Sequence, residues 1–200
     1  MALPAWFKSK GFWNLPNTIT VARCVAVPIM VWLLWDKPGP MEAVLACVVF
    51  VVAMLSDVLD GYLARKWNLQ SVMGAFLDPL ADKLMVVATL VMLIPHGWVP
   101  AWMVVVLESR ELFIGSLRTI AVSEGMVIAA GSLGKFKTAY QSTALGFLLW
   151  HYPTELLPGV VVDAHAVGIL LLWVSMFFSL LSGAEYFWGF LKHLRAQARV

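Results

Sequence analysis

The chain has 200 residues, of which 61% are hydrophobic and only 13% charged, whereas a soluble domain is about half apolar and about a quarter charged. This composition excludes a disordered chain, an ordinary soluble enzyme and a nucleic-acid-binding protein, and a net charge of +2 is too small to indicate a polyanionic partner. The length allows one domain. The two cysteines, Cys24 and Cys47, lie in apolar stretches and are typical of buried side chains, so no disulfide framework is predicted.

Six stretches are predicted to be transmembrane helices, because a spanning helix needs about 20 mostly apolar residues. In chain order they cover about residues 19–35, 41–64, 79–94, 100–122, 136–151 and 164–190. They lack the strict alternation of barrel strands, so helices are favoured. We therefore predict an all-α integral membrane protein with six transmembrane helices. Its expected parts are an interfacial segment at 1–16, a six-helix domain at 17–192 and a basic cytoplasmic tail at 193–200.

The segment before the first span mixes tryptophan, phenylalanine and lysine, since residues 6–13 read WFKSKGFW. This mixture is typical of a short amphipathic helix that lies in the membrane interface; the alternative is a frayed terminus. The first span carries Arg23, and no small-residue cleavage site follows it before Asp36. A cleaved signal peptide is therefore not expected.

The lysines and arginines of the predicted loops indicate the orientation. With six spans both termini lie on one side, which carries nine of these cations, whereas the other side carries only Lys37. By the positive-inside rule, both termini are predicted to be cytoplasmic. The small size and the lack of a transit segment favour a bacterial cytoplasmic (inner) membrane. The nine cations are Lys8, Lys10, Arg65, Lys66, Lys135, Lys137, Lys192, Arg195 and Arg199.

Two of the predicted spans carry four aspartates near their cytoplasmic ends. Asp57 and Asp60 lie three residues apart, and Asp78 and Asp82 lie four apart, so each pair shares one helix face. The short loop between these spans can bring all four carboxylates together. Room for a ligand beside them comes from three residues with almost no side chain, Gly61, Ala64 and Gly74.

Four carboxylates near lipid cannot all stay ionised unless something neutralises them. A hard divalent cation would do so, and oxygen ligands favour magnesium, manganese or calcium over zinc. Because magnesium typically also binds substrate phosphate oxygens, the cluster predicts a phosphate-bearing ligand. The alternatives are a proton relay, or structural ion pairs with Arg65 and Lys83.

The residues from Asp57 to Asp82 match the pattern D-x-x-D-G-x-x-A-R-x8-G-x-x-x-D-x-x-x-D at every fixed position. This pattern resembles the signature of the CDP-alcohol phosphotransferases. Members of that family are six-helix membrane enzymes, often dimeric, that transfer a phosphatidyl or related group from a CDP-linked donor to an alcohol and release CMP. They depend on magnesium or manganese.

The resemblance implies roles for particular residues. Asp57, Asp60 and Asp78 would bind one or two Mg²⁺ or Mn²⁺ ions. Asp82 would be the general base and could also touch the metal. A homodimer is implied as well. The residues expected around the CDP moiety are Asp57, Gly61, Ala64, Arg65, Gly74 and Asp78.

A second group of charges follows in the fourth span and the loop after it. Glu111, Gly115 and Arg118 share a helix face at spacings of four and three residues. An acceptor that itself carries a phosphate would account for cations near the inner membrane face, because arginine and lysine bind phosphate. The predicted acceptor-phosphate ligands are Arg110, Arg118, Lys135 and Lys137.

These cations also have a simpler interpretation. Arg110 could pair with Glu108 or Glu111, and Lys135 and Lys137 could meet anionic lipid headgroups. For Lys137 the two interpretations are equally weighted, whereas for Lys135 the substrate is favoured, as it is for Arg118.

Two further stretches resemble one branch of the family, the phosphatidylglycerophosphate synthases. They are N-L-P-N-x-x-T-x-x-R, ending at Arg23, and R-E-x6-R with G-K-x-K-T-x-x-Q, between Arg110 and Gln141. This resemblance implies CDP-diacylglycerol as the donor, glycerol 3-phosphate as the acceptor and phosphatidylglycerophosphate as the product. The alternatives are a phosphatidylinositol-type or cardiolipin-type acceptor, and a metal- or proton-coupled transporter that uses the same acids. The motifs assign no role to Glu185 or to the side chain of Arg23.

Overall fold

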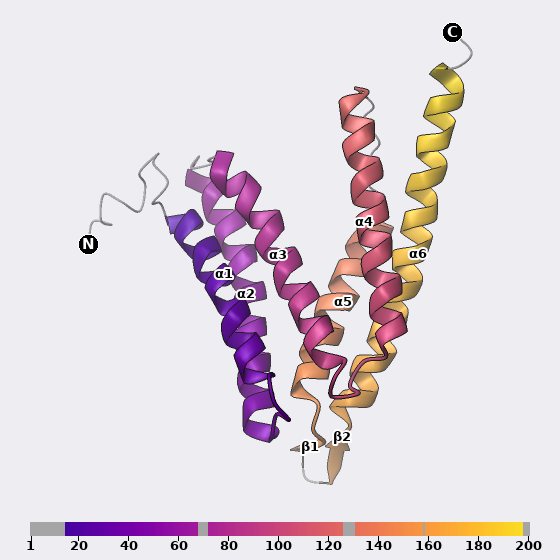
Figure 1. The fold of residues 1–200 in the computed structure, drawn as a ribbon. Coiled ribbons are helices and arrows are strands. Elements are labelled where there is room, and N and C mark those ends of the chain that lie inside the picture. Colours follow the sequence, from indigo (N-terminus) through magenta and orange to yellow (C-terminus); the bar gives the residue numbers. More distant parts are fainter. Residues whose placement is uncertain (1–14, 68–71, 126–130, 158, 198–200) are drawn as a thin grey trace.

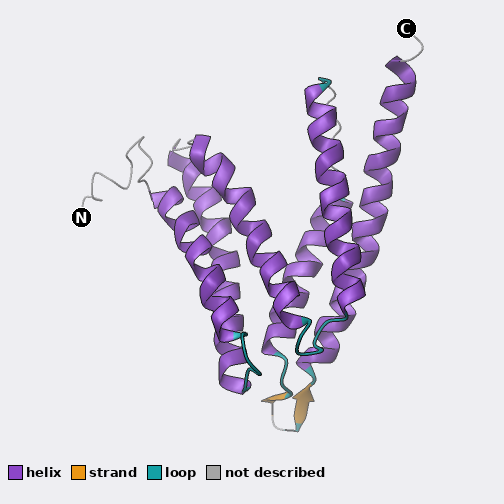
Figure 2. Ribbon diagram, in the orientation of Figure 1, coloured by secondary structure: helices purple, strands orange, loops and turns teal. Residues whose placement is uncertain are grey.

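A computed structural model of the chain describes residues 15–67, 72–125, 131–157 and 159–197. These residues are predominantly helical (Figure 2), as the sequence predicts. In chain order the elements are α1 (Leu15–Leu33), α2 (Pro40–Trp67), α3 (Val72–Leu93), α4 (Ala101–Ser123), α5 (Leu133–Trp150), β1 (Thr154–Leu157), β2 (Val160–Val162) and α6 (Ala164–Gln197).

The helices form two groups that converge at one end and splay apart at the other (Figure 1). α1 packs against α2 and α3, whereas α6 packs against α4 and α5, and α5 joins the groups through its contact with α2. The β hairpin lies at the narrow end, whereas the start of α1 and the end of α6 lie toward the wide end (Figure 1). The wide end therefore carries the part of α2 and α3 that holds the aspartate motif.

The hydrophobic core lies toward the narrow end and takes side chains from all six helices, among them Met30, Phe50, Leu93, Leu107 and Leu148. A smaller cluster joins α4 to α6 farther along these helices. It consists of Ile114, Leu117, Ala121, Tyr186 and Phe190. The two groups of helices are thus fixed to each other at the narrow end, while polar side chains face each other farther up.

The antiparallel hairpin was not predicted from the sequence. It pairs Thr154 with Val162 and Glu155 with Val161. Gly159 turns the chain at φ +81°, a conformation that glycine adopts at little cost, and the β-branched valines suit the second strand. These strands are too short to give a clear alternating pattern, which is why no strand was predicted between the fifth and sixth spans.

The helix boundaries differ most from the predicted spans at three places. α3 begins at Val72 and continues through Pro79, which was taken as its start; proline is tolerated inside membrane helices when neighbouring groups satisfy the backbone. α1 begins at Leu15, and the interfacial helix predicted before it falls on residues that lie almost wholly outside the described part. α6 extends to Gln197, into the segment predicted as a basic tail.

Within the described residues, two helices are long and apolar enough to cross a membrane. The candidate spans are Pro40–Asp57 in α2 and Ala164–Arg195 in α6, and α1 holds a shorter apolar stretch, Thr18–Leu33. Large apolar side chains also lie on the outside of the molecule, such as Trp32 and Leu112, which are 75% and 73% exposed, and lipid would cover such surfaces. The fold is consistent with an all-α membrane protein, and the six-span topology stays a prediction.

The backbones of α5 and α6 approach each other closely at Gly168. A Cβ atom at this position would lie 2.7 Å from Leu148 Cγ and 2.9 Å from the Leu148 backbone nitrogen. Small residues allow such close contact between membrane helices, where van der Waals packing drives association. Gly168 therefore sets the spacing of the helix pair that carries Lys137 and Ser182.

We expect Gly168→Ala to destabilise the protein, because the added methyl group would push against backbone atoms that cannot turn away. Overpacking of this kind costs about 1–3 kcal/mol. The matched control is Gly146→Ala in α5, where a Cβ atom would meet nothing within 4 Å and the better helix propensity of alanine is expected to stabilise by up to about 1 kcal/mol. Thermal unfolding in detergent, followed by tryptophan fluorescence, measures both. An equal rise in Tm for the two variants would contradict the close approach.

Candidate active site

Three of the four predicted aspartates meet on one face of α1. Arg23 Nη1 donates hydrogen bonds to Asp57 Oδ1, at 2.8 Å, and to Asp82 Oδ1, and Thr20 Oγ1 donates to Asp78 Oδ1 at 2.6 Å. Thr20 and Arg23 lie three residues apart and so share a helix face. The carboxylates of α2 and α3 therefore converge as predicted. Their polar partners on α1, Thr20 and Arg23, lie outside the aspartate motif that runs from Asp57 to Asp82.

The burial of this cluster is uneven. The Arg23 side chain is 0% exposed, whereas the side chains of Asp57 and Asp82 are 37% and 39% exposed. The guanidinium thus lies beneath the carboxylates, and the carboxylates face the side from which a ligand can enter. The alternative was structural ion pairs with Arg65 and Lys83. Among the described side chains, Asp57 and Asp82 form ion pairs with Arg23, whereas the pairing with Arg65 falls on a side chain outside the described part.

The remaining residues of the motif lie in α2 and α3, but their side chains are outside the described part of the structure. They are Asp60, Gly61, Ala64, Arg65 and Gly74. The predicted surroundings of the CDP moiety are therefore described only at Asp57 and Asp78. The roles predicted for all residues of the motif stay predictions.

The described side chains, which do not include that of Asp60, hold no group of three or more His, Cys, Asp or Glu residues arranged to bind a metal ion. The chemistry of the donors nevertheless suits a hard cation. Asp57, Asp78 and Asp82 supply carboxylate oxygens from two helices, and such oxygens are the ligands that Mg²⁺ and Mn²⁺ prefer. The cluster fits a divalent cation by donor type.

All four cations predicted for the acceptor phosphate line one cavity of about 630 Å³. Arg110 and Arg118 come from α4, and Lys135 and Lys137 from the first turns of α5. Glu111 and Thr138 line the same cavity. Two cations from each of two helices therefore face a common space, as the sequence predicts, and their binding of a phosphate stays a prediction.

Two of the four cations are already engaged within the protein. Glu111 Oε1 accepts hydrogen bonds from Arg110 Nη1 at 2.7 Å and from Lys137 Nζ at 2.8 Å. Arg110 also donates from Nε to the Ser179 carbonyl oxygen at 2.8 Å and from Nη2 to Ser182 Oγ at 2.7 Å. Arg110 thus anchors α4 to α6, and its pairing with Glu111, one of the simpler interpretations, is present in the structure.

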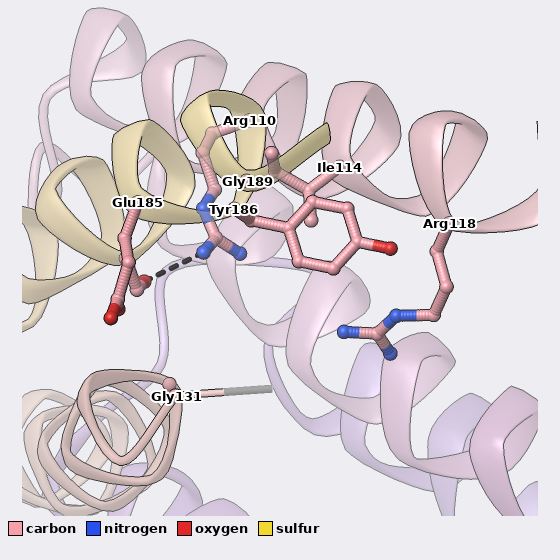
Figure 3. A pocket seen from close by; sticks show the side chains of 9 residues that line it. Arg110, Ile114, Arg118, Gly131, Glu185, Tyr186 and Gly189 are labelled. Carbon is pink, nitrogen blue, oxygen red and sulfur yellow. Dashed lines mark hydrogen bonds between the residues drawn. The ribbon is translucent and has the colours of Figure 1, made fainter. Parts of the chain in front are cut away.

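Arg118 and Lys135 are exposed and form no salt bridge with any of the residues that the structure describes. The Arg118 guanidinium carbon lies 5.8 Å from the centre of the Tyr186 ring, within the range of a cation–π contact. In Figure 3 Tyr186 lies between Arg110 and Arg118. These two cations are accordingly the better placed of the four to receive an anion from water.

Glu185, for which the sequence assigned no role, lines a smaller cavity of about 220 Å³ with Arg110, Arg118 and Tyr186 (Figure 3). A Cβ atom at Gly131 would lie 2.6 Å from Glu185 Oε2, so the chain passes close to this carboxylate just before α5. No sequence pattern indicated this contact, because it joins two segments that are far apart in the chain.

A third cavity, of about 160 Å³, lies where the two groups of helices face each other. Asp82 and Lys83 line it from α3, Glu108 and Glu111 from α4, and Lys137, Thr138 and Gln141 from α5. It shares Glu111, Lys137 and Thr138 with the cavity of the four cations. The cavity lined by Asp82 and the cavity of the four cations are therefore neighbours that share part of their walls.

A converging set of aspartates beside a cationic cavity is an arrangement suited to handling phosphate groups. The chain belongs to the CDP-alcohol phosphatidyltransferase family, whose family model matches residues 13–181.

The chain is also similar to individual proteins with named activities. The chain is 42% identical over 194 residues to a CDP-diacylglycerol–glycerol-3-phosphate 3-phosphatidyltransferase of Bacillus subtilis. This match covers 90% of this chain and 97% of that protein. It is 37% identical over 167 residues to a protein of the same name from Haemophilus influenzae, covering 80% of this chain and 88% of that one. A CMP-forming cardiolipin synthase of Oryza sativa subsp. japonica is 37% identical over 177 residues, with 81% of this chain and 53% of that protein covered.

Proposed function

We propose that the protein transfers a phosphatidyl group from CDP-diacylglycerol to glycerol 3-phosphate, giving phosphatidylglycerophosphate and CMP in phospholipid biosynthesis. The observation that carries the proposal is the shared wall of two cavities, one lined by Asp82 and the other by four cations. An acceptor with a phosphate at one end and a hydroxyl at the other matches this pair of cavities. The names of the bacterial relatives agree with it.

In this proposal Arg118 and Lys135 bind the acceptor phosphate, because they are the exposed cations of the cavity and charge-assisted hydrogen bonds to phosphate are strong. Lys137 lies in both cavities and so stands between the phosphate and the aspartates. Arg110 keeps α4 and α6 together through its contacts with Ser179 and Ser182, and contributes positive charge to the cavity.

The reaction is one substitution at phosphorus. The terminal hydroxyl oxygen of glycerol 3-phosphate forms a bond to the phosphatidyl phosphorus, and the bond from that phosphorus to the bridging oxygen of the diphosphate breaks. CMP leaves with the bridging oxygen. The Asp82 carboxylate accepts the hydroxyl proton as general base. One or two Mg²⁺ or Mn²⁺ ions, held by Asp57, Asp60 and Asp78 with Asp82, would offset the charge on the diphosphate and the leaving CMP.

The setting of the reaction is also proposed. The donor's acyl chains would remain among membrane lipids while its CDP moiety lies against Gly61, Ala64, Arg65 and Gly74. The excess of lysine and arginine in the sequence on the predicted side of the aspartate motif favours a site that faces the cytoplasm of a bacterial inner membrane. A homodimer is expected by analogy with the family.

An acceptor panel tests the proposal. Purified protein with CDP-diacylglycerol and Mg²⁺ or Mn²⁺ is given glycerol 3-phosphate, inositol or phosphatidylglycerol, and CMP and the lipid product are measured by mass spectrometry. Glycerol 3-phosphate is expected to give the highest kcat/KM by at least about 100-fold, because the other acceptors lack its free terminal phosphate. Preference for either of the others would contradict the proposed acceptor.

Cardiolipin-type transfer is the second candidate, favoured by the identity with the rice cardiolipin synthase. Phosphatidylglycerol would then enter from the membrane and not from water, and the exposed Arg118 and Lys135 would have no terminal phosphate to bind.

A transporter that uses the same acids is tested in liposomes. Divalent-cation or proton flux without CMP release would support the transporter and contradict the enzyme.

A further inference from the structure

The position of Arg23 is unusual for a charged side chain. It belongs to α1, within the apolar stretch Thr18–Leu33, and the whole residue is 2% exposed. Charges within apolar spans are costly and mark functional sites. A single nitrogen, Nη1, donates to carboxylates of two other helices, Asp57 and Asp82, which are 34 and 59 residues away in the chain.

We propose that Arg23 is a positioning residue that holds Asp57 and Asp82 at their working separation and supplies positive charge to the pair when no divalent cation is bound. Two carboxylates that share one hydrogen-bond donor repel each other unless a cation lies between or beneath them. The buried guanidinium meets this need in the structure. The inference rests on the proposed function, because it assigns Arg23 to the metal and base residues of that reaction.

The arrangement predicts two opposite effects when the charge of Arg23 is removed. A divalent cation would no longer compete with the guanidinium for Asp57 and Asp82, nor be repelled by it, so the cation should bind more tightly. The base would lose the contact that fixes its side chain, so kcat should fall. If Arg23 merely stabilised the fold, its loss would lower cation affinity and kcat together.

Thr20 provides the matched comparison on the same helix face. Its hydroxyl donates to Asp78 at 2.6 Å, but the group is neutral. Thr20→Val removes this donor with little change in volume and no change in charge. Tighter cation binding is therefore expected for the loss of Arg23 and not for the loss of the Thr20 hydroxyl.

The experiment measures Mn²⁺ binding to the full-length protein in detergent, without substrates, from the electron paramagnetic resonance signal of free Mn²⁺. Arg23→Gln is expected to bind Mn²⁺ about ten-fold more tightly than wild type, while its kcat for CMP release falls by at least about ten-fold. Thr20→Val is expected to bind no more tightly than wild type. Unchanged or weaker Mn²⁺ binding by Arg23→Gln, or equally tighter binding by Thr20→Val, would overturn the inference.

Arg23→Lys keeps the inference testable if the glutamine variant does not fold. Lysine retains the charge but lacks the planar fork of arginine, so we expect Mn²⁺ affinity within about two-fold of wild type together with a clear loss of kcat. A wild-type kcat in this variant would overturn the positioning role. A wild-type protein that releases no CMP would contradict the proposed function, whereas an active wild type with unaltered Mn²⁺ binding in Arg23→Gln would contradict only the role of Arg23.

Discussion

Asp82→Asn is expected to lower kcat for CMP release by about 100-fold to 10,000-fold, the usual contribution of a general base. Asparagine has the volume of aspartate and can accept a hydrogen bond from Arg23, but it cannot take the proton of the acceptor hydroxyl. Expression and thermal stability should therefore change little while turnover is lost. The measurement is the initial rate of CMP formation with saturating CDP-diacylglycerol, glycerol 3-phosphate and Mg²⁺.

The matched control is Asp36→Asn, the same change at an exposed residue between α1 and α2, where the carboxylate accepts only from the Lys37 backbone nitrogen among the described hydrogen bonds. This variant is expected to keep wild-type turnover. Substantial activity in Asp82→Asn would show that the base is a different group.

Arg118→Ala is expected to raise the KM for glycerol 3-phosphate by about 10-fold to 100-fold, because a hydrogen bond to a charged group contributes about 1.5–3 kcal/mol. The KM for CDP-diacylglycerol should hardly change, since Arg118 lies in α4 and does not line the cavity that Asp82 lines. The expected effect is therefore selective for one substrate. Steady-state kinetics with each substrate varied in turn provides the measurement.

Lys192→Ala is the control for loss of a cation from the same predicted membrane face. Lys192 is exposed on α6 and lines none of the cavities formed by Arg118, so both KM values should stay near wild type. An equal rise in the two KM values of Arg118→Ala would indicate that Arg118 supports the fold through its contact with Tyr186 instead of binding the acceptor.

The sequence indicated the parts of the site that lie within one helix or one hairpin. Apolar runs located the helices, and the spacing of Asp57, Asp78 and Asp82 predicted that they would meet across the turn between α2 and α3. The gathering of Arg110, Arg118, Lys135 and Lys137 was likewise predictable, because they lie on two consecutive helices, α4 and α5. Each of these inferences depends on residues of one helix or of two consecutive helices, where helix geometry limits the arrangement.

The contacts that could not be predicted from the sequence join segments that are distant in the chain. Arg23 stood out as a charge in an apolar run, but its partners follow from the packing of α1 on α2 and α3. The use of Arg110 to bind Ser179 and Ser182 depends on the side-by-side packing of α4 and α6, and the approach of Gly131 to Glu185 depends on where the chain re-enters α5. No periodicity within a single element encodes such pairs.

The most direct test of the account measures CMP release by the purified wild-type protein in four mixtures, each with CDP-diacylglycerol and with or without Mg²⁺ and glycerol 3-phosphate. We predict CMP only in the mixture that contains both, with one phosphatidylglycerophosphate formed for each CMP. CMP release after chelation of divalent cations, or release without a glycerol-phosphate lipid product, would contradict a metal-assisted transfer between the aspartate cluster and the cationic cavity.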